Sequence, residues 1–235
     1  ITPEELGFDL GTLGIPEFGT GFARQMLEET RPKSFSELIC ISGLSHGTNV
    51  WLGNAQELIK AEQATLSDVI STRDKIMTDL IYRGVPPKQA FTIMEKVRKG
   101  RNLDEADIQL LREHQVPEWY IDSCLKIKYL FPKAHAAAYV MMGFRIAYYK
   151  VYYPEAFYAA YFSIRADEFN AELVLQGVDY VRKYLKELEA KGNGLTAKEK
   201  NLYTILEVAH EAMLRKIRFL PVDLYRSDAT KFLIT

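Results

Sequence analysis

Residues 132–154 have the sequence PKAHAAAYVMMGFRIAYYKVYYP, and this stretch decides the expected fold. A proline suits the first turn of a helix, where no N–H partner is lost, so Pro132 marks a helix start. Apolar residues then recur at helical spacing from Tyr139 to Tyr149. We therefore expect one long helix from Lys133 to Tyr153, ended by the second proline.

Helical periodicity also dominates the rest of the chain, and strand-like alternation is almost absent. Capping residues, glycines and prolines delimit the segments, and Gly43 is expected to end the second helix. The expected helices cover residues 22–31, 36–41, 72–82, 86–99, 104–114, 117–129, 133–153, 155–165 and 196–218, with two or three more after 167. The prediction is an all-α fold of roughly ten helices, with a short extended segment from Phe219 at the C-terminus.

The composition is ordinary for a soluble protein of 235 residues, and no apolar run is long enough to cross a bilayer. Cys40 and Cys124 are too few for a disulfide framework, and we expect buried thiols in a reducing cytoplasm. The four histidines are too scattered for a zinc site. The chain starts at Ile1 and ends in an apolar run, so we expect a piece of a longer protein.

Positive charge is concentrated in two stretches, although the net charge of the chain is only −1. Residues 81–101 hold six basic residues and one acid, and residues 123–154 hold five basic residues and no acid. A nearly neutral domain can still present one positive face to phosphates. The acid-free stretch is therefore predicted to hold a phosphorylated ligand.

The start of the long helix is the strongest candidate for such a site. The unpaired N–H groups of a helix N-terminus attract anions, and Lys133 opposes the helix dipole there unless an anion is present. His135 and Tyr139 lie one turn apart on the same face, separated by alanines, so a base could stack along them. The alternative is a core helix in which Tyr139 and Met142 are simply buried.

Other cations and donors are weaker candidates. Arg83, Arg98 and Lys99 lie at helix C-termini, where cations are expected for capping alone. His46 and Asn49 belong to a polar segment that offers donors to phosphate or sugar, or forms an ordinary turn. Nucleotidyl transfer needs several carboxylates around paired magnesium ions, and the chain has no Asp-x-Asp pair. We therefore expect no catalytic residue and no metal site in this chain.

Several long strings resemble the PolC-type alpha subunit of bacterial DNA polymerase III, a C-family replicative polymerase. They are GTLGIPEFGT at 11–20, ISGLSHGTNVWLGN at 41–54, VPEWYIDSC at 116–124, FPKAHAAAY at 131–139 and DLYRS at 223–227. The resemblance covers nearly the whole chain and is weakest over the first ten residues.

The resemblance implies the helical fingers region of a DNA-directed DNA polymerase, a nucleotidyltransferase of DNA replication in the bacterial cytoplasm. It implies an irregular opening at 1–21, the main nucleotide-facing fingers at 22–165 and a second helical part at 166–235. Lys133, His135 and Tyr139 would lie beside the nascent base pair, and Arg83 and Arg98 would contact the triphosphate.

The implied partners are the incoming deoxynucleoside triphosphate, primer-template DNA, the palm and thumb domains of the same polypeptide, and the sliding clamp and replisome. The catalytic aspartates and their Mg²⁺ would belong to the palm, and no cofactor would be bound by this chain. Two other hypotheses stay open: a non-enzymatic helical DNA-binding module, and a purely structural helical domain.

Overall fold

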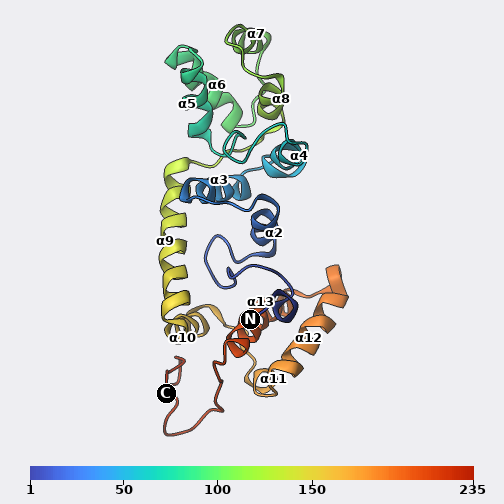
Figure 1. Cartoon of the computed structure of the whole chain (residues 1–235), viewed down its shortest axis with the longest axis vertical. Coiled ribbons are helices and arrows are strands. Elements are labelled where there is room, and N and C mark those ends of the chain that lie inside the picture. Colours follow the sequence, from blue (N-terminus) through green and yellow to red (C-terminus); the bar gives the residue numbers. More distant parts are fainter. The chain divides into compact units, whose positions relative to one another are not determined.

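A computed structural model describes residues 1–235, and its regular structure is helical throughout (Figure 1). The helices are α1 (Pro3–Leu6), α2 (Gly21–Thr30), α3 (Phe35–His46), α4 (Gln56–Lys60), α5 (Arg73–Tyr82), α6 (Pro87–Arg98), α7 (Glu105–Glu113), α8 (Glu118–Lys126), α9 (Lys133–Tyr152), α10 (Pro154–Arg165), α11 (Ala171–Val174), α12 (Val178–Lys191) and α13 (Ala197–Leu214). Two irregular turns, η1 (Trp51–Ala55) and η2 (Gly192–Gly194), complete the set. The predicted all-α fold is confirmed, and the count exceeds ten mainly because α1, α4 and α11 are too short to show a period.

Local chemistry explains most helix starts. The Ser34 hydroxyl accepts from the Glu37 N–H while the Glu37 carboxylate accepts from the Ser34 N–H, and Thr196 and Glu199 repeat this capping box at α13. Because each box satisfies donors that a helix start leaves open, the chain enters these helices at a defined residue. The predicted starts therefore lie within one or two residues of those observed.

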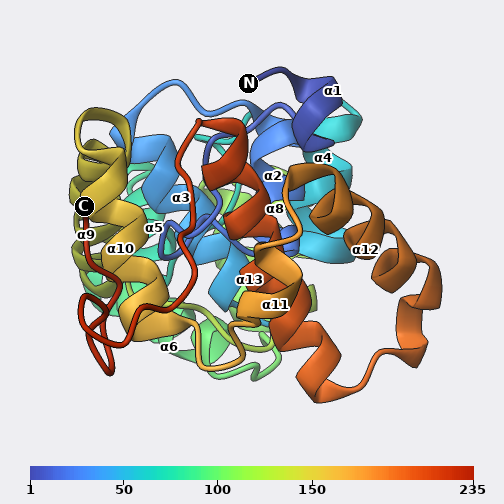
Figure 2. The same cartoon turned by 90° about the horizontal axis from the view of Figure 1, so that it is seen from below.

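The chain forms two compact units, one of residues 20–142 and one of residues 1–19 with 143–235. The boundary between the units, at residues 142 and 143, falls within the sequence of α9. In the first unit α2 packs on α3, α5 on α6 and α7 on α8. In the second unit α12 packs on α13, which Figure 2 shows from below, and α1 also contacts α13. The functional division at 21 and 165 stays a prediction.

Gly43 does not end its helix, contrary to expectation. Helix α3 continues to His46, and Gly43 is buried within it. A Cβ atom at this position would lie 2.4 Å from the Ser71 carbonyl oxygen and 2.8 Å from the Thr72 methyl group. The glycine therefore allows close approach of another segment, which a single sequence does not distinguish from a helix stop.

The substitution Gly43→Ala should lower the free energy of unfolding by about 1–3 kcal/mol, because the added methyl group collides with backbone. Gly21→Ala is the matched control: nothing lies within 4 Å of its Cβ, and it should stabilise by roughly 0.4–1 kcal/mol. Chemical denaturation followed by circular dichroism measures both. Equal effects at the two positions would contradict the close approach.

A buried charge network organises the second unit. Lys150 is 1% exposed, and its Nζ donates to the carbonyl oxygens of Gly11 (2.9 Å) and Leu13 (2.6 Å) and to the Glu211 carboxylate (2.7 Å). The Tyr158 hydroxyl donates to the same carboxylate at 2.8 Å. Every buried charge thus has a partner, and the network ties the opening segment to α9, α10 and α13.

Replacing Lys150 with alanine should cost about 3–5 kcal/mol of unfolding free energy, because Glu211 would be left as an unpaired buried charge. The double variant Lys150→Met/Glu211→Leu removes both charges and should recover part of that loss in the same denaturation experiment. Lys183→Ala breaks an exposed pair on α12 and should change stability by at most about 1 kcal/mol. If Lys150→Ala also cost at most about 1 kcal/mol of unfolding free energy, the network would not be structural.

The segment after α13 has no regular structure but is anchored by aromatic rings. Phe219 and Phe232 both pack on Phe162 and Phe169, with ring centroids 4.8–5.7 Å apart. The Phe232 N–H also donates to the Ser163 hydroxyl at 2.8 Å. The expected extended C-terminal segment is confirmed.

Of the two cysteines, only Cys124 in α8 is fully buried, and burial raises the pKa of its thiol well above the usual range. Cys40 in α3 is only partly buried. None of the helices combines the length and apolar character needed to span a membrane.

Candidate nucleotide-binding surface

The first turn of α9 meets the first turn of α5. The Lys133 N–H donates to Asp74 Oδ2 at 2.7 Å, and the Arg73 N–H donates to the Phe131 carbonyl oxygen at 3.1 Å. The guanidinium of Arg73 lies 3.9 Å from the same Asp74 oxygen, whereas the Lys133 ammonium is exposed and has no ionic partner. Two helix N-termini and the Arg73 guanidinium therefore meet at one carboxylate, with Lys133 in the same first turn of α9, a setting suited to an anion.

An aromatic ladder leads away from this helix start. The ring of His46 stacks on Phe131 (4.8 Å between centroids), Phe131 meets His135 edge-on (5.1 Å), and His135 lies 4.6 Å from Tyr139. His135 is exposed, and Tyr139 is 41% exposed. The core alternative for Tyr139 requires an enclosed ring, so this exposure disfavours it.

The segment with His46 and Asn49 is fixed against the residues that precede α9. Thr48 donates its N–H to the Tyr129 carbonyl and accepts from the Lys128 N–H, both at 3.0 Å. Asn49 has a φ of 57°, and its carbonyl accepts from the Asn54 side chain at 3.0 Å. The polar loop expected here is in part the last turn of α3, and the pairing with Tyr129 brings His46 to the ladder.

Arg98 and Lys99 share one carboxylate at the end of α6. Arg98 bonds both oxygens of Glu95, and Lys99 lies 2.8 Å from the second. These bonds, of which the one from Arg98 has the largest effect, hold the pKa of Glu95 at about 2. The Leu130 N–H donates to the Arg98 carbonyl at 3.4 Å, so Arg98 borders the segment before α9 with much of its charge already offset.

Arg83 lies at the opposite end of α5 from the α9 start. Its guanidinium donates to the Gln115 carbonyl at 3.0 Å, and its own carbonyl bonds the ring of His114 at 3.1 Å. The ten residues of α5 separate it from Arg73 by about 15 Å along the helix axis. The structure thus brings the rings of His46, His135 and Tyr139 into one row, places Lys133 at the start of the same helix, and leaves Arg83 apart from both.

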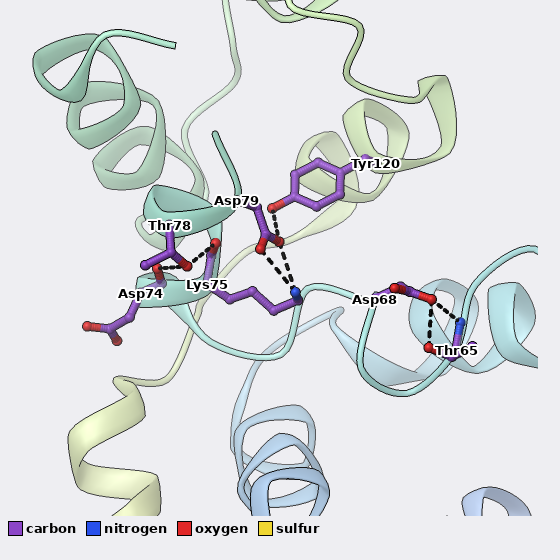
Figure 3. Close-up of polar contacts among 7 residues, drawn as sticks. All are labelled: Thr65, Asp68, Asp74, Lys75, Thr78, Asp79 and Tyr120. Carbon is purple, nitrogen blue, oxygen red and sulfur yellow. Dashed lines mark hydrogen bonds and ion pairs between the residues drawn. The ribbon is translucent and has the colours of Figure 1, made fainter. Parts of the chain in front are cut away.

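The carboxylates near this surface already have hydrogen-bond or ionic partners of their own. Figure 3 shows Asp79 between the Lys75 ammonium (3.0 Å) and the Tyr120 hydroxyl (3.1 Å), with Asp74 pointing away from them. No three histidine, cysteine, aspartate or glutamate side chains gather where they could hold a metal ion. The residues of this chain therefore do not fit a magnesium centre.

Comparisons with known proteins agree on one family. A family model described as "Bacterial DNA polymerase III alpha subunit finger domain" matches residues 9–115. The DNA polymerase III PolC-type of Caldanaerobacter subterraneus subsp. tengcongensis is 62% identical over 235 residues, and that of Clostridium perfringens is 59% identical over 234. The corresponding protein of Bacillus subtilis is 56% identical over 234 residues.

Over its whole length the chain matches one segment of PolC-type DNA polymerase III. Each of these matches covers 100% of the chain but only 16–17% of the relative, so the chain spans about a sixth of the curated relatives that it matches. The finger-domain match at residues 9–115 includes His46, Asn49, Arg83, Arg98 and Lys99. Lys133, His135 and Tyr139 lie beyond it.

The sequence pattern assigns no role to three residues of this surface. Arg73, Asp74 and Phe131 are brought together by contacts across 58 and 59 residues of chain. The Thr-Arg-Asp string at 72–74 indicated only a helix start. Phe131 belongs to the FPKAHAAAY string, in which the aromatic residue before the proline is a sequence signal for this contact.

Replacing Asp74 with alanine should destabilise the first turn of α9 by about 1 kcal/mol, because the Lys133 N–H loses its cap. Asp74→Asn keeps an acceptor oxygen and should retain most of that stability. Amide hydrogen exchange over residues 133–137 measures both variants. Unchanged protection in Asp74→Ala would show that this cap does not hold the helix start.

Proposed function

We propose that this chain is the fingers part of a replicative DNA-directed DNA polymerase, which receives the incoming deoxynucleoside triphosphate and the nascent base pair. The observation that carries the proposal is that α9 starts at the exposed Lys133, beside the first turn of α5, and then carries the exposed rings of His135 and Tyr139. It joins an anion-binding end to an aromatic surface one turn away, as a nucleotide requires.

In this proposal the phosphates lie at the start of α9. Lys133 and Arg73 bind them, and the free N–H groups of the first turns add their dipoles. Because Asp74 already occupies one amide, a phosphate oxygen and this carboxylate compete for the same position. Arg98, Arg83 and Lys99 are proposed as further phosphate contacts, and Arg98 must exchange part of its bond to Glu95 for the ligand.

The sugar and base lie along the aromatic ladder. Stacking on His135 and Tyr139 does not depend on which base is present, because every base has a π-face. His46 and Asn49 are proposed to contact DNA or phosphate at the other end of the ladder.

The chemical role of these residues is positional and electrostatic. They hold the triphosphate in line with the primer 3′-hydroxyl, and their cations offset charge on the departing pyrophosphate. Mg²⁺ and its aspartates are proposed to belong to the palm of the same polypeptide. We further propose that the fingers close over the template and work with the palm and thumb of the same polypeptide. The sliding clamp and the replisome are the proposed partners, and the bacterial cytoplasm is the proposed location.

The test is Lys133→Ala in a full-length polymerase that carries this sequence. Loss of a charged hydrogen-bond donor removes roughly 1.5–3 kcal/mol of binding, so KM for the nucleotide should rise about 10-fold or more. A fall in kcat as well would show that Lys133 also acts in the transition state. Steady-state single-nucleotide incorporation measures both constants.

Lys183→Ala, an exposed cation of α12, is the matched control and should leave KM unchanged. An unchanged KM in Lys133→Ala would overturn the proposal. If that variant instead lost only salt-sensitive affinity for primer-template DNA in the absence of nucleotide, the DNA-binding module would be the better hypothesis.

A further inference from the structure

One face of the second half of α9 is aromatic and exposed. Its side chains are between 52% and 65% exposed, although all are large and apolar or aromatic. We call this set the tyrosine face; it consists of Phe144, Tyr148, Tyr149, Val151, Tyr152 and Tyr153.

The tyrosine face is continuous rather than scattered. The ring of Tyr148 lies 4.5 Å from that of Tyr152 and 6.0 Å from that of Tyr149, which in turn lies 6.0 Å from Tyr153. Arg145 lies on the same exposed side and has no ionic partner. A contiguous aromatic patch with a single arginine has the composition of the buried centre of a protein interface.

The opposite side of the same helix is already packed. Gly143 is buried against the Pro16 carbonyl, which would lie 2.9 Å from an added Cβ, and Lys150 is buried in its charge network. This part of α9 is therefore apolar on its exposed side as well as packed on its buried side. A large apolar patch on the free side of a helix whose other side is packed is normally covered by protein.

We propose that the tyrosine face docks on another part of the same polypeptide, one that presents an apolar surface with carboxylate or carbonyl acceptors. Because the relatives are about six times as long as this chain, most of their surface lies outside it. The acceptors follow from the face itself, since the tyrosine hydroxyls and Arg145 are donors and residues 123–154 contain no acid. The inference rests on the proposal that the chain works within a full-length polymerase.

Two other occupants fit less well. A second copy of the chain, placed on this face by a two-fold axis, would bring another Arg145 and no carboxylate. Single-stranded DNA would find one exposed cation among residues 143–153, too few to follow a backbone, and rings that already lie against one another.

The experiment places the photoreactive residue p-benzoylphenylalanine at position 148 of the full-length polymerase and maps its cross-links by mass spectrometry. The expected result is an intramolecular cross-link to a segment outside residues 1–235. The control carries the same residue at position 225, whose tyrosine is 93% exposed on the C-terminal segment, and should not cross-link to that segment. A cross-link to DNA, to a second copy, or to none of these overturns the proposal.

A second measurement guards against a local effect of the probe. The double variant Tyr148→Ser/Tyr152→Ser should lower the Tm of the full-length polymerase, because buried rings lose their packing. Tyr180→Ser on α12, which is 43% exposed, is the control and should leave the Tm in place. An unchanged Tm in the double variant contradicts docking. Neither readout depends on nucleotide binding, so failure here is separable from failure of the KM test.

Discussion

The hydrogen bond from the Lys133 N–H to Asp74 fixes where α9 begins, and the candidate surface depends on that register. A shift of one residue would turn His135 and Tyr139 by about 100° around the helix and break the line that they form with His46. The neighbouring bond from Arg73 to the Phe131 carbonyl fixes the residue before the proline in the same way. A carboxylate thus occupies a position that the dipoles of two helices make favourable for an anion.

Electrostatics of this surface differ from what a count of charged residues predicts. Residues 81–101 carry six cations, yet Glu95 binds Arg98 and Lys99, while Lys96 bonds Asp104 and Asp107 at the start of α7. The bonds of Lys96, of which the one to Asp104 has the largest effect, raise the pKa of Lys96. The free cations of the first unit are fewer than the sequence indicates, and Lys133 is prominent among them because nothing neutralises it.

Sequence reasoning succeeded where short-range chemistry decides the structure. The prolines at 132 and 154 give the start and end of α9 to within a residue, because a proline acts on the backbone next to it. It failed at Gly43 and at Asp74, since a collision with Ser71 and a cap across 59 residues depend on tertiary contacts. The ladder was half predicted: helical spacing paired His135 with Tyr139, whereas the stack of His46 on Phe131 needed the fold.

The two thiols differ in how accessible they are to labelling reagents. Cys124 of α8 is buried and the pKa of its thiol is raised, so maleimide or iodoacetamide reagents should not react with it. Cys40 is partly accessible on α3, six positions before the histidine that begins the ladder. Within this chain a fluorophore or spin label would therefore attach at one natural position, on the very helix that carries His46, without any engineered cysteine.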